Sequence, residues 1–189
     1  MRTTRIMAAA LIVVARNREQ LEALATRLMN QTGRSIKIIV ADLTNEADLA
    51  KVERVLGNDA SITVLVNNAG IAINGDMASA NPDHLESMIL LNVLAPSRLA
   101  LAVIPGFVSR GHGTLINISS TAALAPEPFG GYSGTKAYML ALSLRLQQEL
   151  AGKGIHVQVV QQEARTDTGE HDGNLIGLPI PPGIGSCAE

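Results

Sequence analysis

The amino-acid sequence predicts an α/β fold with three layers, in which helices cover both faces of a parallel sheet. Short aliphatic runs alternate with longer stretches that repeat apolar residues at helical spacing. Polar residues gather where the aliphatic runs end. The chain has 189 residues, of which 47% are hydrophobic and 17% are charged, which is enough apolar material for the core of one soluble globular domain.

The first elements are expected to be a strand, a helix and a second strand. The run from Ala9 to Ala15 is aliphatic and rich in β-branched residues, as in a strand that is buried on both faces. Asn17 then caps a helix, with Gln20 three residues later in the manner of a capping box, and Gly33 ends this helix. The next strand spans 36–40.

The N-terminal residues permit a second interpretation. Arg2 and Arg5 precede an apolar run from Ile6 to Ala15, as in a short signal peptide. No small-residue cleavage site follows, because Arg16 and a series of polar residues come next. We therefore favour a strand that leads directly into the next helix.

The same alternation continues to about residue 160. A helix opens at Thr44 or Asn45 and is expected to stop at Gly57. The later elements are a strand at 62–66, a loop at 71–80, a helix from 81 to 111, a strand at 114–118, a helix at 132–151 and a strand at 155–160. We expect one domain at 1–168, followed by an irregular tail at 169–189 that is rich in Gly and Pro.

The composition argues against several kinds of partner. A net charge of -2 and an aromatic content of 2%, with no Trp, give no reason to expect nucleic acid. Cys187 is the only cysteine, which excludes an internal disulfide, offers no metal site and favours a reducing, cytoplasmic location. We also expect no membrane partner, since no apolar segment looks long and uninterrupted enough to span a bilayer.

The candidate chemistry lies between Ile116 and Lys136, in INISSTAALAPEPFGGYSGTK. Tyr132 and Lys136 are four residues apart, so on a helix they share one face. An ammonium beside a phenol favours the phenolate and lowers its pKa. With a serine hydroxyl from the preceding strand, these groups predict a proton-transfer site for an alcohol or a carbonyl. The alternative is a half-buried tyrosine and a solvated lysine on an ordinary helix.

Four polar clusters fall at the carboxyl ends of predicted strands, where open parallel sheets bind ligands. The clusters are Arg16-Asn17, Asp42, Asn67-Asn68-Ala69-Gly70 and Ser119-Ser120. Small residues such as Ala69 and Gly70 allow a flat ligand to approach the backbone closely. The alternative is that these polar residues only end strands and cap helices.

Together these residues resemble the short-chain dehydrogenase/reductase family, over roughly Ala10 to Thr168. The matching motifs are VVARN at 13–17, ADLT at 41–44, NNAG at 67–70, LNV at 91–93, INISS at 116–120 and YSGTK at 132–136. The resemblance implies a Rossmann-like fold. It also implies an NAD(P)-dependent oxidoreductase that interconverts a carbonyl and an alcohol by hydride transfer.

The resemblance implies catalytic roles for named residues. Tyr132 would be the general acid/base, and Lys136 would lower its pKa and hydrogen-bond the nicotinamide ribose. Asn92 matches the family's active-site asparagine, which holds a water in the proton relay. The alternative is that Asn92 is only a polar residue that kinks a long helix. The catalytic serine is Ser120 by its place at the strand end and Ser119 by its distance from the tyrosine, and we prefer Ser120.

The resemblance also implies a cofactor site. Residues 67–70 would line the adenosine ribose, and Asp42 would touch the adenine ring. Arg16 stands where the family usually carries the acidic residue that selects NAD. A guanidinium favours a 2′-phosphate, so we expect NADP(H) rather than NAD(H). The implied cofactor-binding residues are Arg16, Asp42, Leu43, Asn68, Ala69, Gly70, Tyr132 and Lys136.

Three departures from the family pattern stand out. The usual first strand, TGxxxGxG turn and first helix are not found, so the phosphate cradle is missing. Without that strand, its neighbours must pair differently or leave apolar edges exposed. Gln161-Gln162-Glu163 stands where the family has Pro-Gly, and the substrate-covering C-terminal part is short.

Two hypotheses follow. One is an active NADP(H)-dependent carbonyl reductase or alcohol dehydrogenase that acts on a small molecule. The other is a catalytically silent module that serves in binding or dimerisation. The helices at 82–110 and 132–151 match those that pair in dimers and tetramers of the family, so a homodimer or homotetramer is possible.

Overall fold

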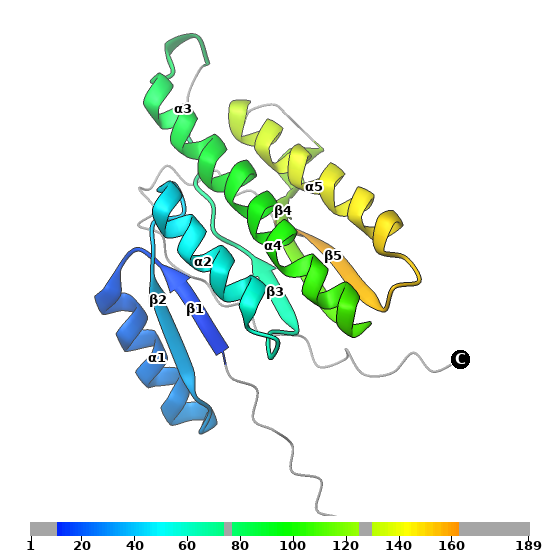
Figure 1. The fold of residues 1–189 in the computed structure, drawn as a ribbon. Coiled ribbons are helices and arrows are strands. Elements are labelled where there is room, and N and C mark those ends of the chain that lie inside the picture. The colour runs from blue at the N-terminus through cyan, green and yellow to red at the C-terminus, as the bar shows by residue number, and fades with distance from the viewer. Residues whose placement is uncertain (1–10, 74–76, 125–129, 163–189) are drawn as a thin grey trace, which may run out of the picture.

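A computed structural model gives the structure of residues 11–73, 77–124 and 130–162 (Figure 1). Strands and helices alternate along the chain, as the sequence predicts. In order, they are β1 (Leu11–Ala15), α1 (Arg18–Thr32), β2 (Ile36–Val40), α2 (Glu46–Asn58), β3 (Val64–Asn67), the 3-10 turn η1 (Met77–Ser79), α3 (Pro82–Ile89), the π-helical turn η2 (Leu90–Leu94), α4 (Ala95–Arg110), β4 (Gly113–Ser120), the 3-10 turn η3 (Thr121–Ala123), α5 (Gly130–Leu150) and β5 (Ile155–Gln162). The predicted tail at 169–189 lies outside the described residues.

The strands form two parallel groups. β1 pairs with β2, and β4 pairs with both β3 and β5. Parallel neighbours need crossover connections, which the helices supply. This is the predicted Rossmann-like arrangement of parallel strands and helices.

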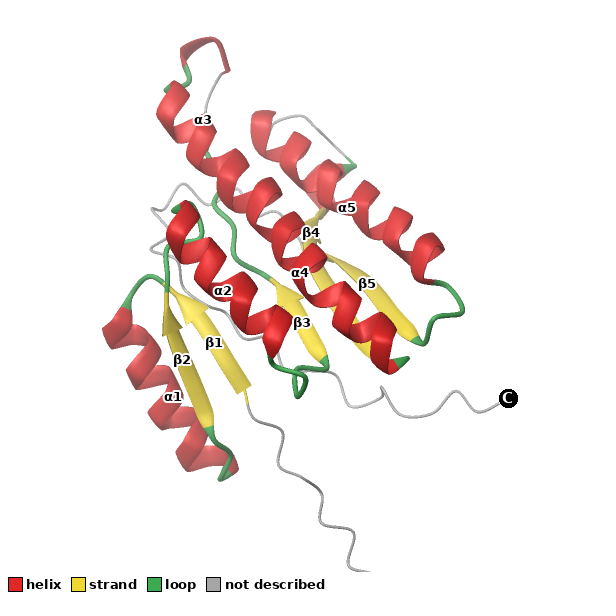
Figure 2. Ribbon diagram, in the orientation of Figure 1, coloured by secondary structure: helices red, strands yellow, loops and turns green. Residues whose placement is uncertain are grey.

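Helices lie on both faces of the strands (Figure 2). α1 packs on β1 and β2, whereas α4 and α5 pack on β3, β4 and β5, and α2 packs on α4. The chain moves from β1 to β2 and then back to β3, so right-handed crossovers place α1 and α2 on opposite faces. The direction of winding therefore reverses between β1 and β3, and open α/β sheets bind ligands beside such a switch point.

β1 and β3 are neighbours at this switch point but do not pair. Within the described residues, β1 hydrogen-bonds only to β2, and β3 only to β4. Leu11 is 45% exposed, and Val64 and Val66 are each 51% exposed. Exposed apolar edges are one of the two outcomes that the sequence predicted for these strands.

The two strand groups share a core through α2 and α4. Arg98 of α4 forms a bidentate ion pair with Glu53 of α2, with Nη2 2.8 Å from Oε2. Buried residues around this contact join β2, α2 and α4: Ile39, Ala41, Leu49, Val52, Ala95 and Leu99. A second cluster joins α4, β4, α5 and β5: Ala100, Leu115, Leu146, Leu150 and Val157.

Side-chain caps fix where the first two helices begin. Asn17 accepts a hydrogen bond from the Gln20 amide at 3.0 Å, as predicted. Asn45, and not Thr44, caps α2 by accepting two backbone amides. Gly57 does not end α2, which continues to Asn58, because Gly57 does not adopt the positive φ of a left-handed cap.

The segment Pro82–Arg110 is one helix of 29 residues, which contains the π turn between α3 and α4. Its most apolar window has a mean hydropathy of 1.8, so by length and composition alone it could cross a membrane. The expectation that no segment meets that test is therefore wrong. Core helices meet the same test, and α4 buries Val103 and Phe107 beside the sheet.

Several strand ends differ from the predicted bounds by one or two residues, among them the end of β5, which was expected at residue 160 and lies at Gln162. β3 begins two residues later than expected, and β4 extends two residues further, through Ser120. The extension arises because the last residues of β4 pair with Gln161 and Gln162 of β5. Glu163, the third residue of the departure from the family pattern, lies outside the described residues.

Candidate active site

Two adjacent serines end β4, and they have different partners. Successive side chains of a strand point to opposite faces, so Ser119 and Ser120 cannot serve the same site. Ser119 Oγ donates to the Lys136 carbonyl oxygen at 2.8 Å. Ser120 forms a side-chain hydrogen bond with Tyr132. The structure therefore pairs the phenol with Ser120, the serine that the sequence analysis preferred.

Tyr132 lies half-buried in the first turn of α5. Burial raises the pKa of its phenol above the ordinary value of 10.0, and the hydrogen bond to Ser120 offsets only part of this increase. The predicted direction was the opposite, since Lys136 was expected to lower this pKa. The Lys136 ammonium lies 5.7 Å from the centroid of the Tyr132 ring, while desolvation acts on the phenol directly. Tyr132 is therefore protonated near neutral pH.

Lys136 is buried one helical turn from Tyr132, with 6% of its surface exposed. Its Nζ donates to the carbonyl oxygen of Ile118 in β4 at 3.0 Å. Burial lowers the pKa of this ammonium from 10.5 to about 8. The alternative of a solvated lysine on an ordinary helix is therefore wrong. A buried cation beside a phenol is an arrangement typical of functional sites.

Replacing Lys136 with methionine should change how stability depends on pH. In wild type, the folded pKa of about 8 lies below the ordinary 10.5, so the unfolded chain binds more protons between these values. Wild-type stability relative to Lys136→Met should therefore rise with pH from about 8 to 10, by at most about 3 kcal/mol. Tyr132 is present in both proteins, so the titration of its phenol does not contribute to this difference. Urea denaturation across this range measures the difference, and equal slopes for the two proteins would contradict it.

Asn92 lies in the π turn, and its side chain is 2% exposed. Its Oδ1 accepts from the Ile71 amide at 2.9 Å, and its Nδ2 donates to the Ile71 carbonyl oxygen at 2.8 Å. Nδ2 also donates to Thr135 Oγ1 at 3.1 Å. Asn92 therefore joins the loop after β3 to α5, and π turns often occur at functional sites. Its role in holding a water stays a prediction.

Asn67, the first residue of the NNAG motif, does not line the ligand edge. It is buried, and its Nδ2 donates to the Pro96 carbonyl oxygen at 3.2 Å and to Asn117 Oδ1 at 2.9 Å. Asn117 in turn donates to Ser143 Oγ at 2.9 Å. This buried network, which ties β3 to β4 and α5, was not predicted from the sequence. A signal for it was available, since alternation along β4 puts Asn117 on the opposite face from Ile118.

Asn68, Ala69 and Gly70 are exposed at the carboxyl end of β3, as expected for ligand-binding residues. A Cβ added at Gly70 would lie 3.1 Å from Asn92 Oδ1 and 3.5 Å from Lys136 Nζ. The missing side chain leaves the backbone of this loop next to the buried polar groups. This loop and the Tyr132 site therefore meet at one edge of the sheet.

Arg16 and Asp42 follow β1 and β2 at the same edge. Their side chains approach to 4.0 Å and are 65% and 38% exposed. Burial opposes ionisation of Asp42, but hydrogen bonds from Thr44 and the charge of Arg16 outweigh it and lower the pKa of this carboxyl. The predicted ligand Leu43 packs its side chain against the core, which leaves its backbone for any cofactor contact.

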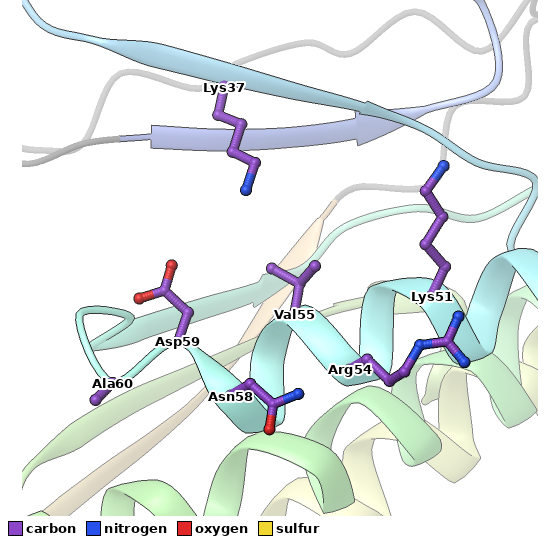
Figure 3. A pocket seen from close by; sticks show the side chains of 7 residues that line it. All are labelled: Lys37, Lys51, Arg54, Val55, Asn58, Asp59 and Ala60. Carbon is purple, nitrogen blue, oxygen red and sulfur yellow. The ribbon is translucent and has the colours of Figure 1, made fainter.

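A separate cavity of about 530 Å³ lies at the opposite end of the strands (Figure 3). Lys37 of β2 points toward Asp59, in the turn after α2, and Lys51 and Arg54 of α2 also line this space. None of the predicted site residues lines it. Because parallel α/β sheets bind their ligands at the carboxyl ends of the strands, this cavity is not the candidate active site.

The family of this chain follows from its similarity to known proteins. A sequence model of the short chain dehydrogenases matches residues 3–170. The chain belongs to this family. The short-chain dehydrogenase from Sphingobium yanoikuyae, solved in complex with NADPH, is 44% identical, with a TM-score of 0.80 over 82% of this chain and 61% of that one.

Two human proteins are also similar to this chain. One is 17-beta-hydroxysteroid dehydrogenase type 3, 35% identical over 79% of this chain and 49% of its own. The other is inactive hydroxysteroid dehydrogenase-like protein 1, 32% identical over 78% of this chain and 46% of its own. The chain thus spans about half the length of these curated relatives.

The short-chain dehydrogenase family implies a nicotinamide dinucleotide, and the residues at the carboxyl edge fit both ends of one. At the adenosine end, exposed Arg16 and ionised Asp42 offer a cation and a hydrogen-bond acceptor. At the nicotinamide end, Gly70 lets the exposed backbone of the loop after β3 pack closely on Lys136 and Asn92. The TGxxxGxG pattern, which in this family receives the pyrophosphate, is absent from the sequence.

Proposed function

We propose that this chain forms the site of an NADP(H)-dependent oxidoreductase that interconverts a ketone and an alcohol. The observation that carries the proposal is the triad at the end of β4, in which the Tyr132 phenol is hydrogen-bonded to Ser120 beside the buried ammonium of Lys136. A bound nicotinamide supplies or accepts the hydride. The remaining steps are proton transfer and charge stabilisation by the chain's own residues.

The raised pKa of Tyr132 favours the reduction direction near neutral pH. A protonated phenol donates its proton to the carbonyl oxygen as that oxygen gains negative charge. Ser120, already bonded to the phenol, stabilises the same oxygen. The phenolate that remains is stabilised by the Lys136 ammonium. Oxidation of an alcohol needs the phenolate at the start, so its rate should increase with pH while reduction stays comparatively flat.

The ketone class follows from the named relative only by analogy. Human 17-beta-hydroxysteroid dehydrogenase type 3 is named for a steroid hydroxyl. A 17-ketosteroid is therefore a suitable first probe. A bulky ketone is the second, because a similar alcohol dehydrogenase from Comamonas testosteroni, 42% identical, is described as specific for bulky-bulky ketones. The experiment follows loss of NADPH absorbance with each ketone, using the whole 189-residue chain. No NADPH consumption with either probe, together with no thermal shift on adding NADPH, would contradict the proposal.

Arg16 should determine preference for the 2′-phosphate. Arg16→Glu should weaken NADPH binding about 10- to 100-fold, because it removes a charge-assisted hydrogen bond and adds repulsion. NADH binding should change much less. Arg27→Glu is the matched control, since it makes the same charge change at an exposed position within α1, the helix that begins two residues after Arg16. Thermal-shift titrations of the wild type and both variants with each cofactor measure these affinities. Equal losses of NADPH and NADH binding in Arg16→Glu would argue against this role.

A second candidate function is a catalytically silent binding module. The edges of β1 and β3, which are unpaired within the described residues, favour it. One similar human protein is named as inactive, which supports the same candidate by analogy. A thermal shift with NADPH but no turnover of any ketone would favour this second function. NADPH at 100 times its dissociation constant should stabilise the folded chain by about 2.7 kcal/mol.

We also propose that the helices at 82–110 and 132–151 form a contact between copies of the chain. α4 and α5 expose large apolar side chains, with Leu101 69% and Leu144 48% exposed. Tyr138 is also exposed, and its hydroxyl lies 3.0 Å from Ser97 Oγ, which joins the two helices into one surface. Such faces are common in symmetric dimers. Sedimentation equilibrium measures the mass of the chain in solution. The mass of a dimer or tetramer would support this contact, and that of a monomer would contradict it.

A further inference from the structure

Thr135 joins two hydrogen bonds that neither the sequence motifs nor the proposed chemistry assign to it. Its Oγ1 accepts from Asn92 Nδ2 at 3.1 Å and donates to the Tyr132 carbonyl oxygen at 2.7 Å. Asn92 in turn holds both backbone groups of Ile71. An unbroken hydrogen-bonded chain therefore runs from the loop after β3, through the π turn, to the backbone of Tyr132.

The burial of this chain distinguishes it from an ordinary helix contact. Threonines in helices often bond a carbonyl in the preceding turn, and Thr26 in α1 does so with the Glu22 carbonyl at 2.9 Å. Thr26 is exposed, whereas Thr135 is 4% exposed and Asn92 is 2% exposed. A buried donor that loses its acceptor has no water to replace it. Removing the Thr135 hydroxyl therefore leaves Asn92 Nδ2 with only the Ile71 carbonyl.

We propose that Thr135 is a positioning residue, whose hydroxyl fixes the first turn of α5 against Asn92 and so holds Tyr132 in place toward Ser120. The inference rests on the proposed function for its kinetic consequence. Its structural consequence does not depend on that function. Tyr132 is three residues before Thr135, so a shift of this turn moves the phenol relative to the fixed end of β4. A misplacement of about 1 Å in a catalytic group costs about 100-fold in rate.

The test compares Thr135→Val, which keeps the shape and removes the hydroxyl, with Thr135→Ser, which keeps the hydroxyl. Thr26→Val is the matched control, because it removes a helix back-bond that has no asparagine partner. The chain has only two tyrosines, so tyrosine labelled with carbon-13 at the ζ position gives two signals, and Tyr138→Phe assigns them. The ζ signal reports the hydrogen bonding and ionisation of the Tyr132 phenol without any turnover.

Thr135→Val should shift the Tyr132 signal at neutral pH and raise the pKa of Tyr132 further, because its bond to Ser120 lowers that pKa. It should also lower kcat about 10- to 100-fold while KM for NADPH stays within about twofold. Thr135→Ser and Thr26→Val should resemble wild type in both measurements. Thermal denaturation of each variant confirms that it is folded at the temperature used.

An unchanged Tyr132 signal in a folded Thr135→Val protein would overturn the inference, whatever its activity. A shifted Tyr132 signal and a lowered kcat in Thr135→Ser would also overturn it, since the loss of the hydroxyl would then not be the cause of these changes in Thr135→Val. A wild-type chain that reduces no ketone contradicts the proposed function, and the ζ signal alone then decides the role of Thr135. The two failures are therefore distinguishable.

Discussion

Replacing Tyr132 with phenylalanine should lower the turnover of ketone about 100- to 10,000-fold, the range in which a positioned acid or base contributes. The phenol is the one group that the geometry offers as proton donor, since it is bonded to Ser120 and remains protonated near neutral pH. Phenylalanine keeps the ring that lies beside Lys136 and removes only the hydroxyl. Binding of NADPH should therefore change little, which separates loss of chemistry from loss of the site.

The measurement is loss of NADPH absorbance for kcat, with thermal shift for binding, on the same two proteins. Tyr138→Phe is the matched control, because it removes the other phenol of the chain from an exposed position of the same helix. It should keep wild-type turnover. If Tyr132→Phe retained more than about a tenth of the wild-type kcat, another group would have to supply the proton, and the assignment of Tyr132 would be wrong.

The order and type of elements could be predicted because the sequence repeats a simple pattern. The run at β1 is continuous and aliphatic, the run at 36–40 is broken only by Lys37, and Asn17 and Gly33 mark both ends of α1 as predicted. Element ends were harder to predict where pairing decides them. β4 extends to Ser120 because β5 continues beside it, and no local pattern in β4 carries that information.

The residues of the candidate site could be predicted, but not their electrostatics. Spacing alone placed Tyr132 and Lys136 on one face of α5. The predicted direction of the Tyr132 pKa shift was wrong, because burial of the phenol depends on how α5 packs on the end of β4. The same packing buries Lys136 and lowers its pKa to about 8. Helical spacing describes neighbours along one element and contains nothing about desolvation by another.

Contacts between distant segments were missed for a related reason. Asn67 belongs to a motif that suggested a ligand, yet it bonds Asn117, fifty residues later, inside the core. Thr135 stands inside the YSGTK motif without a role until Asn92 is seen to bond it. Asn92 and Asn117 are each flanked by apolar residues in the sequence, and that is the one signal that pointed to buried partners.

The second large effect is expected at Gly113, where α4 passes into β4. A Cβ at this position would lie 2.7 Å from Cδ1 of Phe107 and in still closer overlap with Cγ and Cδ2. Phe107 is 0% exposed, so its ring has no solvent into which to move. Gly113→Ala should therefore destabilise the fold by about 3 kcal/mol or more, since overpacking a core forces side chains and backbone to shift.

Gly134→Ala is the matched control, because its added methyl meets nothing within 4 Å and Gly134 lies inside α5. Alanine is the better helix former, so this variant should be more stable than wild type by about 0.5–1 kcal/mol. Urea denaturation measures both, and Gly113→Ala should also lower the melting temperature by about 6–12 °C. The clash with Phe107 predicts one further result: in the double variant Gly113→Ala, Phe107→Ala, the methyl occupies space left by the ring, so the two losses should be less than additive. Full additivity would mean that Gly113→Ala acts through the backbone and not through the buried ring.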